Sequence, residues 1–390
     1  MKRKICVVSG SRADYGLLRW VMQEIKGDAN LTLQVVVTGM HLSSTFGQTY
    51  KSIELDGFMI DRKVEILADD DTPTGIAKSI SAGLVGFAEA FQELKPDIIV
   101  ILGDRFETFA AASAALVMKI PVAHLHGGES TLGAYDEAFR HSITKMSHLH
   151  FVAAKEYRNR VIQLGESPEN VFTVGGMGID NIKRLQLLSR KELEASLDLK
   201  FDKKSLLITF HPATLEEETP ENQLNELLSA LSELMDTTLI FTLPNADSGG
   251  LVLIKMIEGF VRENNNAKAF ASLGQLRYLS CIAQVDGVLG NSSSGLLEVP
   301  SFKKGTVNIG DRQLGRILAS SVINCRPERE SILRALKELY SAKFQEQIKK
   351  TDNPYGEGGA SEKVVSILRS FPIANLVKKK FHDLQFNCDV

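Results

Sequence analysis

The sequence has little cysteine, little tryptophan and no excess charge of either sign. Its 390 residues include four cysteines and one tryptophan, and 45 basic residues stand against 48 acidic ones. The cysteines lie far apart without a CxxC pair, which excludes a disulfide scaffold and the common zinc spacings. The near balance of charge gives no support to a general nucleic-acid surface. We therefore expect a cytoplasmic protein that binds no nucleic acid.

Long apolar segments are also missing. The apolar run after the basic start of the chain covers only residues 5–8, which is typical of a strand and too short for a signal peptide. The longest weakly polar stretch, residues 109–118, is about half the length of a membrane span. We expect no association with a membrane. The length itself predicts more than one domain.

The chain instead alternates short apolar runs with longer helical patterns. Runs rich in Val and Ile, without polar alternation, are typical of strands that are buried on both faces. Their alternation with helices predicts parallel sheets covered by helices. The predicted strands are 5–8, 33–37, 98–102, 122–125, 206–209, 239–242, 287–289 and 306–309. The predicted helices are 17–26, 75–94, 106–119, 136–147, 222–235, 251–263, 276–282 and 331–340.

A glycine-rich segment and a charged stretch between residues 174 and 203 predict a boundary between two doubly wound α/β domains of similar size. We assign residues 1–178 to the first domain, 179–365 to the second, and 366–390 to a helical tail that packs back on the first domain. The region from 360 onward is predicted to form two helices on either side of Pro372.

Polar clusters follow several of the predicted strands. In open α/β sheets, ligands bind beyond the carboxyl ends of the strands, so these clusters are candidate sites. They are residues 9–16, 103–107, 124–129 with 136–141, 210–214 with 244–250, and 290–298.

The first two clusters also have ordinary structural explanations. Residues 9–16 place glycine, serine and Arg12 at a predicted helix start, which suits a phosphate. This cluster is neither a Walker A loop nor GxGxxG, and a capped turn explains it equally well. Asp104 and Arg105, taken alone, are best explained as an ion pair at a helix start.

The clusters further along the chain carry stronger signals. His124 and His126 would share one side of a strand, close to Glu129 and Asp136. Metal binding is one explanation, but without an HExxH spacing acid–base chemistry is favoured. A lone histidine such as His211 is more often structural, although its place at a strand end favours function.

Three serines, 292–294, open a predicted helix between two glycines, and Glu298 lies one turn further on. A serine N-cap with an acid in the first turn is the plain explanation. A diphosphate at the helix start, with Glu298 on a ribose, is the favoured one.

Taken together, these motifs resemble those of the hydrolysing UDP-N-acetylglucosamine 2-epimerases of sialic-acid biosynthesis and their close relatives. The resemblance runs in order from about residue 5 to 370. It rests on Ser11-Arg12-Ala13-Asp14-Tyr15, Gly103-Asp104-Arg105-Phe106, His124-x-x-Gly127-Gly128-Glu129, Arg140-His141-x-Ile143-Thr144-Lys145, His211-Pro212, Gly290-Asn291-Ser292-Ser293, Glu298, Gly310-Asp311-Arg312-Gln313 and Asn353-Pro354-Tyr355-Gly356.

The resemblance implies a GT-B fold, in which two Rossmann-like domains face a cleft. It implies that UDP leaves C1 as the C2 proton is removed, and that water then adds to the 2-acetamidoglucal to release N-acetylmannosamine. Asp104 and Asp136 match acids assigned to acid–base steps, and Glu129 matches an acid at the mouth of the sugar pocket. The nucleotide and diphosphate would be held by Arg12, His211, Asn245, Ser292, Ser293, Glu298 and Arg312, with Arg105 on the sugar or phosphate. No metal or other cofactor is implied, and relatives assemble as homodimers or homotetramers.

His126 departs from the family pattern, because members that act on UDP-N-acetylglucosamine often carry a glutamate there. A histidine can serve as acid or base near neutral pH, so His126 joins the catalytic candidates. The change is also consistent with another sugar, a UDP-linked 2,4-diacetamido-2,4,6-trideoxyglucose of the legionaminic-acid pathway. Other functions considered are a non-hydrolysing 2-epimerase, a GT-B glycosyltransferase and a regulator that only binds the nucleotide sugar. Carboxylates near a diphosphate repel it, which disfavours the last of these.

Overall fold

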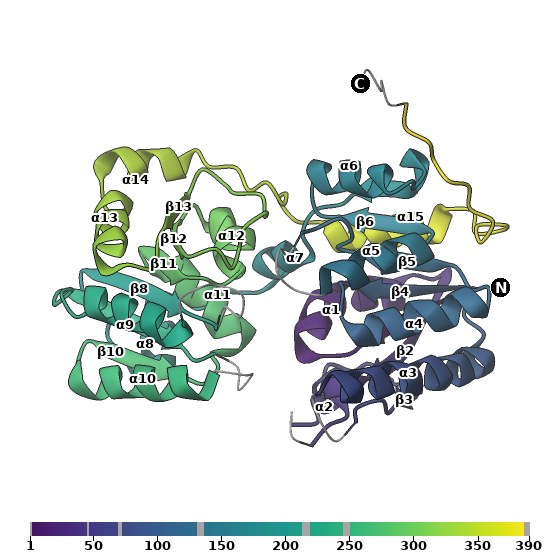
Figure 1. Cartoon of the computed structure of the whole chain (residues 1–390), viewed down its shortest axis with the longest axis horizontal. Coiled ribbons are helices and arrows are strands. Elements are labelled where there is room, and N and C mark those ends of the chain that lie inside the picture. The colour runs from purple at the N-terminus through teal and green to yellow at the C-terminus, as the bar shows by residue number, and fades with distance from the viewer. Residues whose placement is uncertain are drawn as a thin grey trace. The chain divides into compact units, whose positions relative to one another are not determined.

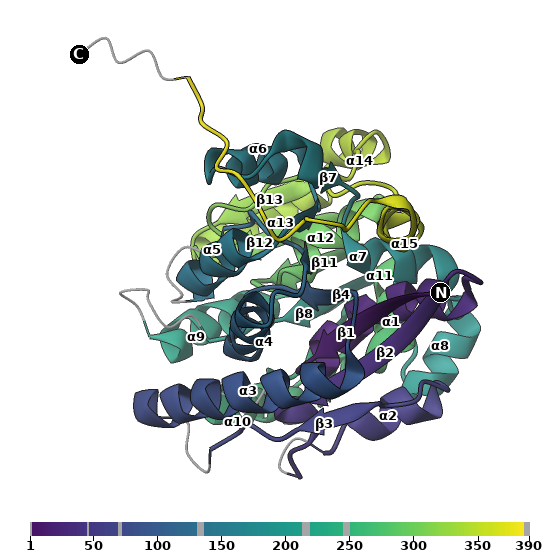
Figure 2. The same cartoon turned by 90° about the vertical axis from the view of Figure 1, so that its right-hand side faces the viewer.

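The computed structural model describes residues 2–44, 47–68, 72–130, 136–212, 219–244 and 250–385. The chain forms two compact units. Of the described residues, those up to 181 and those from 358 onward form unit 1, and those from 182 to 357 form unit 2. Each unit has a wholly parallel sheet with helices on its two faces (Figure 1, Figure 2). The predicted pair of Rossmann-like α/β folds is therefore confirmed.

The sheet of unit 1 has the strand order β3-β2-β1-β4-β5-β6-β7. Its strands are β1 Arg3–Ser9, β2 Leu31–Thr38, β3 Arg62–Val64, β4 Ile98–Leu102, β5 Val122–Leu125, β6 Leu149–Val152 and β7 Val171–Thr173. Its helices are α1 Arg12–Gly27, α2 Tyr50–Leu55, α3 Pro73–Leu94, α4 Phe106–Val117, α5 Asp136–Met146, α6 Lys155–Gln163, α7 Met177–Arg184, whose last three residues belong to unit 2, and α15 Ala360–Ser370.

Alternate residues of the central strands supply the two cores of unit 1. Ile5 and Val7 of β1 face α1 and α15, whereas Cys6 and Val8 face α3 and α4. All four are buried. This arrangement explains why the strand runs show no polar alternation, since a sheet covered on two faces has no wet side.

The sheet of unit 2 has the order β10-β9-β8-β11-β12-β13. One core joins it to α9, α10, α13 and α14, and the other joins it to α8 and α11. The strands are β8 Lys204–Thr209, β9 Thr237–Thr242, β10 Ala267–Phe270, β11 Gly287–Gly290, β12 Gly305–Ile309 and β13 Val322–Cys325. The helices are α8 Arg190–Leu197, α9 Pro220–Leu231, α10 Gly250–Glu263, α11 Gly274–Gln284, α12 Ser294–Leu297, α13 Arg329–Leu339 and α14 Ala342–Lys349.

The domain boundaries expected after residues 178 and 365 fall inside α7 and α15, and each of these helices is continuous. The whole of α15 belongs to unit 1, because its apolar face packs on α1 and the neighbouring strands. In Figure 1, α15 is the yellow helix that lies with unit 1.

The prediction of a second helix after Pro372 is wrong, because the described residues from 373 to 385 form no helix. Contacts with unit 1 hold this segment instead. The Lys379 ammonium donates to the carbonyls of Lys145 (2.7 Å) and Ser147 (2.6 Å) and pairs with Glu166 at 2.7 Å. The amide of His382 donates to the Gly165 carbonyl at 2.9 Å. These bonds hold the segment in a non-helical conformation, and together they outweigh its weak local helix propensity.

Buried side chains of α7 fasten it to the rest of unit 1. The Asp180 carboxylate, 1% exposed, accepts the backbone amides of Gly359 (2.6 Å), Ala360 (3.0 Å) and Ser361 (2.7 Å). It thereby satisfies the free amides at the start of α15. Next to it, Asn181 accepts from the Trp20 indole at 2.7 Å. One carboxylate thus joins the place where the chain leaves unit 1 after residue 181 to the place where it returns at residue 358.

Among the helices that the structure describes, none is both long enough and apolar enough to cross a bilayer.

We predict that Gly165→Ala loosens the tail segment. Gly165 ends α6 with φ +86°, and a Cβ built there lies 2.3 Å from the Phe381 ring. The variant should lose about 1–3 kcal/mol of unfolding free energy, measured by urea unfolding followed through Trp20 fluorescence.

Gly57→Ala is the matched control, because Gly57 has φ +83° but only the Lys26 ammonium within reach, at 3.8 Å. It should cost less than Gly165→Ala, and the difference should vanish in a Phe381→Ala background. Equal losses for the two glycine variants in the unmodified chain would show that Phe381 does not pack on Gly165.

Candidate functional site

Each sheet has one point at which the order of its strands reverses, and the polar clusters lie there. In unit 1 this switch point lies between β1 and β4, and in unit 2 between β8 and β11. The loops that follow such strands diverge to opposite faces of the sheet, which leaves a natural ligand site at their carboxyl ends. The sequence clusters 9–16 and 103–107 follow β1 and β4, and the clusters 210–214 and 290–298 follow β8 and β11.

The turn between β1 and α1 is held by its own side chains. The Ser11 hydroxyl accepts the Asp14 amide at 3.3 Å, and the Asp14 carboxylate accepts the Gly10 amide at 3.2 Å. Arg12 is the first residue of α1 and is exposed. The turn therefore combines a stable N-cap with an exposed arginine at the start of a 16-residue helix, where an anion is favoured.

An ion-pair network fixes Asp104 after β4. Asp104 pairs with the buried Arg140 of α5, and Arg140 also lies 3.5 Å from the Glu137 carboxylate. Glu137 in turn accepts from Ser130 (3.1 Å) and is bonded to His141 (3.1 Å). A guanidinium that is shared by two carboxylates orients each of them through charge-assisted hydrogen bonds.

Asp136, the first described residue of α5, lies near this network. Burial, and then the nearby Asp104 carboxylate, raise the pKa of Asp136, although Arg105 and Arg140 oppose the shift. A carboxyl with a raised pKa beside a carboxylate that is paired with arginine is the arrangement in which one group can donate a proton and the other can accept one.

A second carboxylate pair lies on the β1 side of the switch point. Glu107 is 1% exposed and accepts from the Arg105 guanidinium, at 3.1 Å to Nε and 3.0 Å to Nη2. Burial raises the pKa of Asp14 to about 6; Arg105 lowers it, and Glu107 raises it. Arg105 therefore offsets the negative charge of two carboxyl groups of unit 1, Glu107 and Asp14.

Two buried histidines hold the site's turns in their neutral form. The His124 ring donates from Nε2 to the Gly103 carbonyl at 2.8 Å and lies 3.3 Å from the Thr144 hydroxyl. Burial lowers the pKa of His124 to about 3. His41 lies between the hydroxyls of Ser9 (2.9 Å) and Thr49 (2.8 Å), and burial lowers its pKa to about 4.

His126 does not share a strand face with His124, and that prediction is wrong. β5 ends at Leu125, and His126 has φ +63°, which turns its side chain away from the strand alternation. Its Nδ1 lies 2.6 Å from the Glu129 carboxylate, and its Nε2 accepts the amide of Met177 at 3.2 Å. His126 and Glu129 are thus brought together, whereas His124 bonds to a different set of residues, Gly103 and Thr144.

In unit 2, Asn291 organises the predicted nucleotide residues. Its side chain exchanges two bonds of 2.8 Å with the backbone of His211. Its carbonyl accepts from Arg312 at 3.0 Å and from Gln313 at 2.9 Å. Burial, and then Arg312, lower the pKa of His211 to about 4. His211 and Arg312, which are 101 positions apart in the sequence, therefore meet at one switch point.

The serine segment opens only a one-turn helix, α12, which covers Ser294–Leu297 with Ser293 as its N-cap. One turn has a small dipole, so the hydroxyls and amides matter more here than the helix. Gly290 precedes the segment with φ +133°, and a Cβ there would lie 2.0 Å from the Thr209 carbonyl, so glycine alone lets β11 pass β8. Burial raises the pKa of Glu298. Asn245 lies outside the described residues.

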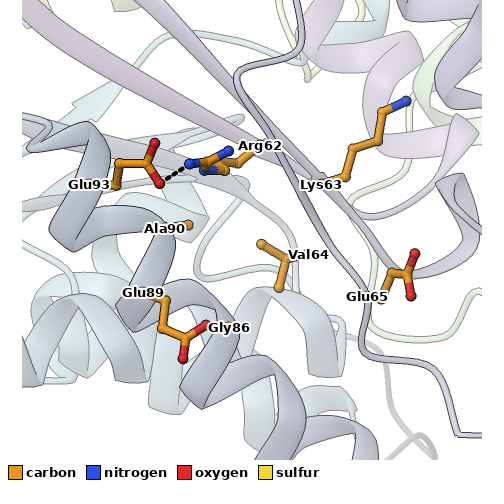
Figure 3. Close-up of a pocket in the computed structure, with 8 residues that line it drawn as sticks. All are labelled: Arg62, Lys63, Val64, Glu65, Gly86, Glu89, Ala90 and Glu93. Atoms are coloured by element: carbon orange, nitrogen blue, oxygen red, sulfur yellow. Dashed lines mark ion pairs between the residues drawn. The ribbon is translucent and has the colours of Figure 1, made fainter.

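A surface hollow of about 390 Å³ lies elsewhere on unit 1, between the edge strand β3 and α3. Figure 3 shows its lining, where Arg62 pairs with Glu93 and Val64 lies opposite Gly86. It carries charges of both signs at a sheet edge and none of the sequence candidates. Its position away from the strand ends separates it from the candidate site.

Within the described ranges, no three His, Cys, Asp or Glu side chains are grouped closely enough to hold a metal ion.

Comparison with known proteins agrees with this arrangement. A family model described as UDP-N-acetylglucosamine 2-epimerase matches residues 23–369. The chain belongs to this family. Among curated relatives, it is 43% identical to a hydrolysing GDP/UDP-N,N′-diacetylbacillosamine 2-epimerase of Campylobacter jejuni, over 98% of this chain and 100% of the relative. It is 40% identical to polysialic acid biosynthesis protein P7 of Escherichia coli, over 98% of each chain.

A solved UDP-GlcNAc 2-epimerase of Neisseria meningitidis, bound to UDP-GlcNAc, has the same fold. It superposes with a TM-score of 0.73 at 21% identity, covering 94% of this chain and 99% of that one. The 2-epimerase family fold therefore extends over nearly the whole chain.

For this 2-epimerase family member, the sequence indicated most of the residues at the switch points but missed their supports. Glu107 and His41 are buried beside the β1 turn, and Asn291 holds His211. Glu107 and Asn291 lie within the clusters 103–107 and 290–298, but the sequence predicted no supporting role for them. His41 is isolated in the sequence and gave no signal.

The buried neutral histidines predict a loss of stability in mild acid. His148 has its pKa lowered to about 4, first by burial and then by Lys379 and His150. The unfolded chain takes up the proton near pH 6.5, so stability is full above that pH and is lost as the pH falls towards 4. Each such histidine contributes a slope of about 1.4 kcal/mol per pH unit. Carboxyl groups with raised pKa values, which are Asp14, Asp136 and Glu298, act in the opposite direction and offset part of this loss of stability.

The test is urea unfolding between pH 7.5 and 5, followed through Trp20. His148→Asn keeps an acceptor for the Val122 amide, which bonds to His148 Nδ1 at 3.2 Å, and should show a shallower slope by about one proton. An unchanged slope would mean that His148 is not held neutral.

Proposed function

We propose that this protein is a hydrolysing UDP-sugar 2-epimerase, which releases UDP and a free 2-epimeric N-acetylated sugar through a 2-acetamidoglucal. The observation that carries the proposal is the division of chemistry between the two switch points. In unit 1, the Asp104 carboxylate lies near enough to Asp136 to help raise its pKa, and unit 2 gathers His211 and Arg312 around Asn291. Family membership supports the same chemistry.

The reaction requires help at two places. The C2 proton is not adjacent to a carbonyl and is barely acidic until the C1–O bond to UDP lengthens. Positive groups must therefore stabilise the departing diphosphate while a carboxylate accepts the C2 proton. In the second half, a proton is delivered to C2 from the opposite face, while the hydroxyl of water adds to C1, with a proton acceptor to activate that water.

We assign these tasks by the environment of each residue. Asp136, with its raised pKa, suits the group that exchanges a proton with the sugar. Asp104 is held in place by its ion pair with Arg140 and is the second carboxyl group of the reaction. Glu129 acts at the sugar. The diphosphate and nucleotide are held by Arg12, Arg105, His211, Asn245, Ser292, Ser293, Glu298 and Arg312. No step calls for a metal, because cationic and hydrogen-bonding groups can meet the diphosphate charge.

For the sugar, we propose UDP-N,N′-diacetylbacillosamine, the 2,4-diacetamido-2,4,6-trideoxy compound. The name of the Campylobacter jejuni relative supports it, as does His126 at a position where a glutamate is common in enzymes for UDP-N-acetylglucosamine. UDP-N-acetylglucosamine remains the second candidate, supported by the description of the family model. The expected cytoplasmic location and homo-oligomeric state stay predictions.

The deciding experiment offers each UDP sugar separately in deuterated water. We expect free UDP and a free 2-epimer that carries deuterium at C2, with the higher kcat/KM for the diacetamido sugar. UDP that stays on the epimerised sugar would indicate a non-hydrolysing epimerase. Turnover that depends on an added acceptor would indicate a glycosyltransferase.

We also predict that Asp104→Asn and Asp136→Asn each lower kcat on the order of 10²–10⁴-fold while UDP affinity is kept. Asp28→Asn is a matched control, because Asp28 pairs with Arg369 on the surface of unit 1 at 3.1 Å; its kcat should stay within about twofold, as for a surface ion pair. UDP titration and thermal unfolding of each variant separate lost chemistry from lost folding. Near-normal turnover by either site variant removes that residue from the mechanism.

A further inference from the structure

The loop after β5 fixes His126 in an uncommon conformation. Its φ of +63° is rare for a residue with a side chain. The backbone is still tied to the sheet, because the His126 amide donates to the Phe151 carbonyl at 2.9 Å. Gly128 follows with φ +76°, and a Cβ there would lie 2.5 Å from the Tyr157 carbonyl. The loop is therefore pressed against α6, and the direction of the His126 ring is set by the fold.

The two ring nitrogens of His126 have partners that define its proton. Met177 offers a backbone amide, which can only donate, so Nε2 at 3.2 Å must be the unprotonated nitrogen. The proton then belongs on Nδ1, where it is donated to the Glu129 carboxylate at 2.6 Å. The two side chains are 12% and 7% exposed. This hydrogen-bond pattern assigns the neutral Nδ1–H tautomer.

We propose that His126 is a positioning residue that holds Glu129 and the start of α7, and is not the group that takes the sugar's proton. The proposal rests on the proposed function and assigns a different task to one candidate of its site. To accept a proton at Nε2, the ring would have to give up Met177 and place an N–H against an N–H. His126 therefore supplies a donor for Glu129 and an acceptor for α7 at the same time.

The position of α7 gives this contact its effect. α7 also carries Asp180 and Asn181, which bind the start of α15 and the Trp20 indole. The loop that presents Glu129 is thus joined through His126 to the helix that leads out of unit 1. A carboxylate at position 126 would face Glu129 with like charge and offer no donor, so histidine and glutamate are not interchangeable in this chain.

The test compares His126→Gln, His126→Glu and His126→Ala with the unmodified protein. A glutamine amide has one donor and one acceptor and does not titrate. We expect His126→Gln to keep kcat within about tenfold, with an unshifted pH profile, and the other two variants to lose at least about 100-fold. Hydrogen exchange at the Met177 amide, measured without substrate, should remain slow in the glutamine variant and become fast in the alanine variant, which has no acceptor at position 126.

The two possible roles of His126 predict opposite rankings. If His126 takes the proton, His126→Glu supplies a replacement base and keeps turnover, while His126→Gln loses it; that ranking overturns the proposal. Loss in all three variants with Met177 still protected in His126→Gln, or normal turnover in all three, overturns it as well. If the unmodified protein releases no UDP from either sugar, the proposed function fails, and the exchange at Met177 still decides whether His126 holds α7.

Discussion

The Asp180 carboxylate is the interaction on which the organisation of the chain depends. It lies on α7, just before the chain leaves unit 1, and accepts three consecutive amides at 359–361, just after the chain returns. A buried carboxylate needs such donors, because an unsatisfied charge in the interior is costly. The helix start likewise needs an acceptor for its free amides. The Asp180 carboxylate and the amides of residues 359–361 therefore satisfy each other. This fixes the place where the chain leaves unit 1 to the place where it returns.

At the switch point of unit 1, carboxylates are likewise paired with partners that balance their charge. Arg140 is shared by Asp104 and Glu137, and Arg105 balances Glu107 beside Asp14. In unit 2, Asn291 holds His211 and Arg312 together, through bonds to the His211 backbone and from Arg312 to its own backbone carbonyl. One unit therefore presents carboxyl groups with adjusted proton affinity, and the other presents donors that suit a diphosphate.

The sequence predicted the fold because burial on two faces leaves a visible pattern in the strands, and each predicted strand is found with small shifts of its ends. It also located the clusters at the switch points, since these follow from strand order. It could not show that His126 leaves the strand, because that turn depends on the packing of Gly128 against Tyr157. Nor could it show the extended tail, which is held by the carbonyls of Lys145 and Ser147 more than 200 positions earlier in the chain.

The return of α15 to unit 1 has a consequence for how the protein is made. Unit 1 includes α15 of its returning segment as well as the helices before residue 182, so one of its core helices is synthesised only after residues 182–357 of unit 2. Unit 2 is complete in the nascent chain before unit 1 is, which reverses the usual order in which the N-terminal domain folds first. Until α15 arrives, the apolar side of α1, with Leu18 and Met22, lacks its cover, and the growing chain must keep that surface from other partners.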